Sequence, residues 1–180
     1  MTLQELWQLF PVILTAPDKQ WSQWAADEIV CLHTLLGPSC TAIHHIGSTA
    51  IEGIWAKPII DLLAETDSNL HFADIKCRLL NAGYLCMHET ENRISFNKGY
   101  TPAGFADKVF HLHLRLTGDH DEIYFRDYLN THNDIAKEYE ALKRSLCKTY
   151  AHDRDGYTNA KSEFVRHYTA IAKSRITEAP

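Results

Sequence analysis

The apolar pattern of this chain changes its period near residue 120, and this change leaves few possible fold classes. Before that point, short strand-like runs are interspersed with two helical stretches. After it, apolar residues recur at the three- and four-residue spacing of helices. Because strands come first and helices follow, the order favours an α+β fold over a strict strand–helix–strand alternation. We expect a mixed β-sheet packed with helices and a helical C-terminal part.

The same pattern places the individual elements. Strands are expected at 41–46, 58–65, 84–88, 93–97 and 109–116, and the last of these alternates most regularly. Helices are expected at 21–36, 69–81, 123–132, from 133 or 134 to 150, and from 158 or 159 onward. The stretch 98–106 contains two glycines and one proline and is expected to be a loop.

The length and composition are typical of one globular domain. With 180 residues, 45% of them hydrophobic and 23% charged, the chain is long enough to bury a core. A formal net charge of −5 gives no positive footprint for long nucleic acids. No run approaches the ~18 consecutive apolar residues of a membrane span. We therefore expect a small-molecule substrate, no long nucleic acid and no membrane partner.

Two further features indicate a cytoplasmic protein. The amino terminus has no basic region ahead of its apolar residues, so no signal peptide is expected. The five cysteines contain no Cys-x-x-Cys pair, which favours reduced thiols over a disulfide framework or structural zinc.

A lone carboxylate stands in the strand-like run 59–63. Asp61 lies between apolar neighbours there, and desolvating an unpaired carboxylate costs several kcal/mol. The small-residue turn Gly47–Ser48 follows an earlier apolar run and offers backbone N–H groups that suit an anion such as phosphate. Together these features predict a site for a nucleotide phosphate and a divalent metal ion. The alternative is a tight turn and an aspartate that caps a neighbouring backbone group.

Two histidines alternate with apolar residues in the run 109–116. His111 and His113 therefore point to the face opposite the apolar side chains. Imidazoles two residues apart on a strand can share one metal ion or one phosphate. If this strand lies beside the run that holds Asp61, either histidine could complete a metal site with that carboxylate. The alternative is a half-exposed strand whose polar side chains face solvent.

Four basic residues are candidates for neutralising phosphate. Lys57 precedes the Asp61 run, and Arg126, Lys143 and Lys161 lie on the expected C-terminal helices. Ammonium and guanidinium groups suit phosphate oxygens. The alternative is that these residues are solvated charges on helix surfaces.

Several separated motifs resemble the signature of the GrpB family, in the same order along the chain. They are His45-Ile46-Gly47-Ser48-Thr49-Ala50, Gly53, Lys57-Pro58-Ile59-Ile60-Asp61, His111-Leu112-His113-Leu114, Phe125-Arg126-Asp127-Tyr128-Leu129, Glu138-Tyr139, Leu142-Lys143, Tyr157, Lys161 and Phe164. The resemblance extends over roughly residues 20–172. That family looks like a branch of the nucleotidyltransferase superfamily, so the resemblance implies that residues 1–180 form one GrpB-like domain with a nucleotidyltransferase-like fold.

The resemblance also carries roles onto individual residues. The phosphate-binding glycine and serine of the superfamily fall on Gly47 and Ser48, and its first metal-binding carboxylate falls on Asp61. Its second carboxylate falls on Leu63, so that element is absent from this chain. Its third falls on the run 109–116, where this chain has histidines.

These observations predict a metal-dependent nucleotidyltransferase-like protein that uses Mg²⁺ or Mn²⁺ and a nucleoside triphosphate to modify an unidentified small molecule. Asp61 and His113 would hold the metal ion, and His111 or His113 would act as a base toward the acceptor. Two alternatives stay open. One is a nucleotide- or coenzyme-binding module that has lost transfer, and the other is a metal-dependent phosphohydrolase built on the two histidines.

Overall fold

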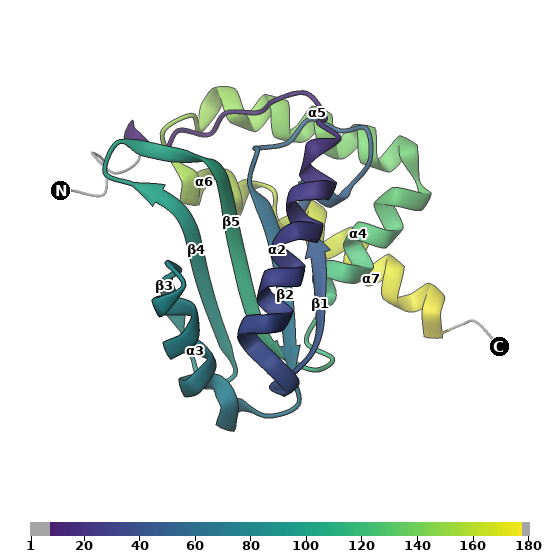
Figure 1. Cartoon of the computed structure of the whole chain (residues 1–180). Coiled ribbons are helices and arrows are strands. Elements are labelled where there is room, and N and C mark those ends of the chain that lie inside the picture. Colours follow the sequence, from purple (N-terminus) through teal and green to yellow (C-terminus); the bar gives the residue numbers. More distant parts are fainter. Residues whose placement is uncertain (1–7, 178–180) are drawn as a thin grey trace.

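A computed structural model describes residues 8–177 and contains one five-stranded sheet packed with helices (Figure 1). The sheet order is β1-β2-β5-β4-β3, with β1 (Cys40–Ile46), β2 (Ile60–Thr66), β3 (Leu85–Glu89), β4 (Arg93–Thr101) and β5 (Gly104–Leu116). Strands β2 and β5 run parallel and the other neighbours antiparallel, so the sheet is mixed as predicted. Within the described residues, no helix is both long and apolar enough to cross a bilayer.

Helices α2 (Gln20–Leu36) and α3 (Phe72–Asn81) pack on one face of this sheet (Figure 1). The backbone N–H of Gln20 donates to the Asp18 carboxylate at 2.8 Å, which fixes the start of α2. The first turn of the predicted helix 69–81 is a short 3₁₀ turn (Asn69–His71), and α3 follows it directly. Both helices share one apolar core with alternate residues of the central strands.

The remaining helices form a separate layer, visible in green and yellow in Figure 1. They are α4 (Asp121–Thr131), α5 (Asn133–Thr149), α6 (Arg154–Ala160) and α7 (Ser162–Thr177). This layer has its own apolar cluster, which includes Phe125, Leu129 and Tyr139 and also takes in Ile51 and Ile54 from the segment before β2. The cluster shares no buried residue with the core under α2 and α3.

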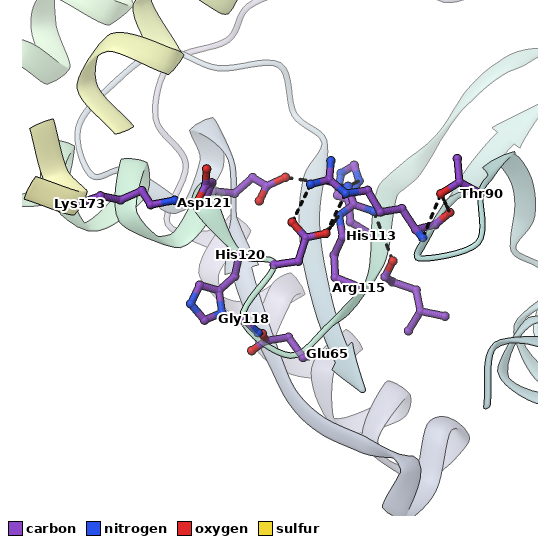
Figure 2. Close-up of polar contacts among 12 residues, drawn as sticks. Glu65, Thr90, His113, Arg115, Gly118, His120, Asp121 and Lys173 are labelled. Atoms are coloured by element: carbon purple, nitrogen blue, oxygen red, sulfur yellow. Dashed lines mark hydrogen bonds and ion pairs between the residues drawn. The ribbon is translucent and has the colours of Figure 1, made fainter. Parts of the chain in front are cut away.

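The turn between β5 and α4 is fixed by a buried carboxylate at the end of β2. Glu65 accepts a hydrogen bond from the Gly118 N–H at 2.8 Å and lies 2.8 Å from Nδ1 of His120 (Figure 2). Burial opposes ionisation of this carboxyl, but these contacts and the nearby His44 together lower its pKa. The chain is thereby directed from the sheet into the C-terminal helices.

The stretch 98–106, predicted to be a loop, is instead the end of a long hairpin. Strand β4 continues to Thr101 and β5 begins at Gly104, so only two residues form the turn. Gly99 marks a shift of the pairing register between Lys98 and Tyr100, and a Cβ on it would collide with the Lys108 carbonyl oxygen. The glycine that suggested a loop therefore permits a close approach of two strands at a β-bulge.

The start of the last helix was also predicted wrongly. Instead of one helix from 158 or 159, the chain forms α6 and α7, which meet at Lys161. The Asp153 carboxylate caps α6 by accepting from the Gly156 N–H at 2.8 Å. The sequence did not predict this helix because Gly156 has a low helix propensity. The structure shows why glycine is needed there, since a Cβ would collide with Asp153 and Tyr150.

Candidate functional site

A cavity of about 1170 Å³ lies between the sheet and the C-terminal helices. Strand alternation supplies its floor, because Phe110, Leu112 and Leu114 enter the core under α2 and α3 while His111 and His113 face the cavity. Its lining includes every site residue proposed from the sequence except Arg126, namely Gly47, Ser48, Lys57, Asp61, His111, His113, Lys143 and Lys161. The cavity lining thus combines residues of β1, β2, β4 and β5 with residues of the four C-terminal helices α4, α5, α6 and α7.

The glycine turn and the strand aspartate are in direct contact. Gly47 follows β1 with φ +71°, and a Cβ on it would overlap the Asp61 carboxylate. Only glycine combines this left-handed backbone with such a close approach. The contact puts the carboxylate at the 3₁₀ turn Ser48–Ala50, where an anion could meet backbone N–H groups.

Asp61 is held as an ion at the cavity surface, with 28% of its side chain exposed. Nδ1 of His111 lies 3.1 Å from Oδ1 of Asp61, because the two residues are direct partners in the parallel pair β2–β5. Burial opposes ionisation of this carboxyl. The hydrogen bond from His111 and the charges of His111, His113 and Lys57 overcome it and lower the pKa of Asp61 to about 2.

Behind His111 lies a residue that the sequence did not suggest. The Tyr100 hydroxyl is 2.8 Å from Nε2 of His111, and the two rings stack with centroids 5.9 Å apart. The Arg154 guanidinium lies 5.7 Å from the centroid of the Tyr100 ring. Tyr100 was missed because the stretch around it was assigned to a loop, and Arg154 because nothing in its local pattern marks it.

His113 occupies the next cavity-facing position of β5. Its Nδ1 lies 3.4 Å from Oγ of Ser95. The same nitrogen lies 3.4 Å from an Nη atom of Arg115 (Figure 2). Burial, helped by the charges of Arg115 and His111, lowers the pKa of His113 to about 4 against the attraction of Asp61. His113 is therefore neutral at physiological pH.

Lysines gather around the rings of Tyr157 and Tyr139 at the helical side of the cavity. The ammonium groups of Lys57 and Lys161 lie 5.3 and 5.1 Å from the centroid of its ring. The Lys143 ammonium donates to the Trp55 carbonyl at 2.5 Å, although this side chain is only 1% exposed. Burial and the neighbouring cations lower the pKa of both Lys57 and Lys143 to about 7.

Within the described part of the chain, these lysines and Arg154 form no ion pair with a carboxylate. Among the ion pairs of the described residues, none includes Lys57, Lys143, Lys161 or Arg154. Like charges gathered in a partly desolvated cavity repel one another, and an incoming polyanion would relieve that repulsion. This side of the cavity can therefore bind a phosphorylated ligand.

Arg126 is the proposed site residue that the structure does not bring to the cavity. Its guanidinium donates to the His45 carbonyl at 2.7 Å and to the Asp127 carboxylate at 2.7 Å. The bond to the His45 carbonyl joins α4 to the end of β1. The sequence could not reveal this, because the direction of a helix face is set by the packing of the whole layer.

The metal ligands are fewer than in a two-carboxylate site. Leu63, where a second carboxylate would stand, is fully buried. Among the residues that the structure describes, no three or more His, Cys, Asp or Glu side chains are arranged to hold a metal ion. This gives no support to a phosphohydrolase that binds its metal through the histidines. A single hard cation shared between Asp61 and ligand phosphates would still fit, because Mg²⁺ commonly takes one or two carboxylates with substrate oxygens.

A known protein family matches this sequence over most of its length. The family described as "GrpB protein" matches residues 11–170. The chain belongs to the GrpB family. It is 37% identical over 163 residues to the Glutamate-rich protein GrpB of Alkalihalophilus pseudofirmus, an alignment that covers 86% of this chain and 91% of that protein.

Solved structures agree with this relationship. The crystal structure of the conserved protein GrpB from Enterococcus faecalis matches with a TM-score of 0.81 and 26% identity, over 92% of this chain and all of that one. The Cid1 poly(U) polymerase bound to MgATP matches with a TM-score of 0.51 and 13% identity, over 83% of this chain and 46% of Cid1. The predicted nucleotidyltransferase-like α+β fold is thereby confirmed. This chain spans less than half of Cid1, and that likeness concerns the fold alone.

Proposed function

We propose that this GrpB-family protein binds a nucleoside triphosphate in the cavity and transfers its nucleotidyl group to a small-molecule acceptor, with Mg²⁺ or Mn²⁺ as cofactor. The observation that carries the proposal is the ionised Asp61 carboxylate held against the Gly47 turn, in the same cavity as cations that pair with no carboxylate of the described residues. A metal-bound polyphosphate carries charges that complement both groups.

Different residues would bind different parts of the nucleotide phosphates. The turn at Gly47 and Ser48 would place backbone N–H groups and a hydroxyl at phosphate oxygens, while Lys57, Lys143 and Lys161 would neutralise the remaining charge. Polyanion binding raises the pKa of the two lysines that titrate near 7, so they become fully charged when the ligand is present.

Asp61 would hold the metal ion, because it is ionised, exposed to the cavity and beside the turn. A divalent ion bound there would stabilise the charge that develops on phosphate oxygens. The structures of Cid1 with MgATP and MgGTP support this cofactor class, since Cid1 shares the fold. His111 would keep the carboxylate in place through its hydrogen bond.

The cellular setting follows from the same chemistry. We place the protein in the cytoplasm, where nucleoside triphosphates are available, and all five cysteines are free thiols, as a reducing compartment requires. The acceptor would be a small molecule, because a chain with net charge −5 offers no general attraction to long nucleic acids.

A second candidate function is a nucleotide- or coenzyme-binding module without transfer activity. The fully buried Leu63 favours it, because the position next to Asp61 on the cavity side of β2 carries no second carboxylate. Such a module would bind the nucleotide and gain stability from it without turnover.

Thermal unfolding with a panel of nucleotides and divalent metals tests binding. We expect at least one nucleoside triphosphate to raise the Tm of the wild type, and Mg²⁺ or Mn²⁺ to increase that shift. Asp61→Asn should lose the metal-dependent part while preserving side-chain volume. The matched control is Asp67→Asn, an exposed carboxylate away from the cavity. No shift with any nucleotide, in any metal, would contradict both candidate functions.

Transfer is tested separately. Incubation with α-phosphate-labelled triphosphates and a pool of small metabolites should yield a labelled small molecule and free pyrophosphate in the wild type. Binding without labelled product would leave the second candidate in place of the first.

A further inference from the structure

The two imidazoles on the cavity floor have opposite hydrogen-bond partners. A neutral imidazole has one N–H donor and one acceptor nitrogen, and its neighbours decide which nitrogen carries the proton. The neighbours of His111 and His113 differ in this respect. Their identities determine the tautomer of each ring, independently of any ligand.

At His111, the partner of Nδ1 can only accept. The oxygens of a carboxylate accept hydrogen bonds, so the contact of 3.1 Å between Oδ1 of Asp61 and Nδ1 of His111 places a proton on that nitrogen. In the neutral ring Nε2 is then the acceptor, and the Tyr100 hydroxyl at 2.8 Å donates to it. Tyr100 thereby fixes the tautomer that donates to Asp61.

At His113, the partner of Nδ1 can only donate. Arg115 has no acceptor atom, so the contact of 3.4 Å requires an unprotonated Nδ1 on His113. The Ser95 hydroxyl can donate to the same nitrogen. The proton of the neutral ring therefore lies on Nε2, which has no hydrogen-bond partner among the described residues, in a side chain that lines the cavity.

We propose that His113 presents its Nε2–H to the bound ligand as a hydrogen-bond donor to a phosphate oxygen, and that Arg115 and Tyr100 are the positioning residues that set the opposite tautomers of His113 and His111. This inference rests on the proposed function. It replaces the metal-binding and base roles that the sequence suggested for His113, because both need a free electron pair on the nitrogen that here carries the proton.

The surroundings of Arg115 support this assignment. The residue is 7% exposed, and its Nε is the one buried side-chain nitrogen or oxygen among the described residues without a hydrogen-bond partner. Its carboxylate neighbours, Asp119 and Glu122, approach no closer than 3.9 Å (Figure 2 shows the group around Arg115). A guanidinium buried with such poor pairing reduces stability. Its contact with His113 gives a functional reason for keeping it there.

The direct test is a long-range ¹H–¹⁵N spectrum of the histidine side chains in the full wild-type chain near neutral pH, without ligand. The pattern of cross-peaks distinguishes an Nδ1–H ring from an Nε2–H ring. We expect His111 as Nδ1–H and His113 as Nε2–H, with resonances assigned from His111→Gln and His113→Gln. An Nδ1–H tautomer at His113 would overturn the proposal.

Two variants test the positioning residues. Tyr100→Phe keeps the stacked ring but removes the hydroxyl, so the His111 peaks should change while those of His113 stay. Arg115→Met keeps the aliphatic stem but removes the donor, so the His113 peaks should change while those of His111 stay. A change at both histidines in both variants would indicate general rearrangement and contradict separate control; the wild-type spectrum remains decisive if either variant fails to fold.

The donor role is tested by nucleotide affinity. His113→Leu should weaken binding about tenfold, whereas His113→Gln, whose amide can donate from a similar position, should weaken it by less than about threefold. Equal affinities of the two variants would overturn the donor role while the proposed function stands. If the wild type binds no nucleotide, the proposed function fails together with the donor role, and the spectrum still decides the tautomers.

Discussion

The two faces of the sheet are formed by the same strands but have different roles. One face packs in the apolar core, and the other faces the cavity. Under α2 and α3, Leu112 and its neighbours are fully buried in a continuous apolar core. On the opposite face, one residue away along the same strand, His111 and His113 lie beneath a cavity. The helices above that cavity obtain their stability from an apolar cluster of their own. Because successive side chains of a strand point to opposite faces, the residues that pack the core alternate with those that face the cavity.

The largest effect is expected on the packed face. Leu112→Ala should lower the free energy of unfolding by about 3 kcal/mol, because it removes buried methyl groups and leaves a cavity. Ser95→Ala on the cavity side loses only a long contact to His113 and should cost about 0.5 kcal/mol. Urea denaturation measures both. Similar losses for the two variants would contradict the separation.

On the cavity face, stability should depend on pH through buried lysine. The pKa of Lys143 is lowered to about 7 in the folded chain, whereas an unfolded lysine titrates near 10.4. Between these pH values the unfolded chain binds more protons, so the free energy of unfolding should rise with pH, by something on the order of 2 kcal/mol from pH 7 to 10. Urea denaturation across this range should show a flatter profile for Lys143→Met. The exposed Lys148→Met on the same helix should keep the wild-type slope.

Two glycines with the same φ angle allow the effect of backbone strain to be distinguished from an effect on the site. Gly47 and Gly53 both have φ +71°, so Gly47→Ala and Gly53→Ala should each lose about 1 kcal/mol of stability. Only at Gly47 does the new Cβ collide with Asp61, whereas Gly53 has open space around it. The metal-dependent Tm shift with nucleotide should therefore disappear in the first variant alone. Its survival in Gly47→Ala would show that the turn is not part of the site.

A small effect on nucleotide binding is expected at Arg126, which does not line the cavity. Arg126→Gln should lower the free energy of unfolding by about 1 kcal/mol, because it loses the hydrogen bond to the His45 carbonyl. Its nucleotide-induced Tm shift should fall less than that of Lys57→Gln, whose side chain lines the cavity. Thermal unfolding with and without nucleotide gives both numbers, and the reverse order would restore Arg126 as a phosphate ligand.

Much of the packed face could be predicted from sequence because its signals are local. The alternation of β5 and the apolar spacing of α2 depend on neighbours a few residues away, and both appear in the structure. Asp61 could be singled out for the same reason, since a carboxylate in an apolar run breaks a local rule.

The cavity face required information that no local pattern contains. Tyr100 contacts His111 just after the strand register shifts at Gly99. The sequence alone does not show whether such a glycine lies in a loop or in a β-bulge where two strands approach closely. Arg154 is the first residue of α6, and the break between α5 and α6 brings its guanidinium close to the Tyr100 ring. That Arg126 contacts the His45 carbonyl and does not line the cavity could not be predicted, because a helix can rotate about its axis without changing its sequence pattern.

The separate apolar cluster of the C-terminal helices has a meaning for the divergence of GrpB proteins. One wall of the cavity belongs to a layer whose buried apolar residues form a cluster separate from the core under α2 and α3. Substitutions in α6 and α7 should therefore alter the space above the strands more directly than the core beneath them. Family members built on this plan could keep the strand residues below the cavity while varying the helix residues above it, and so accept different ligands.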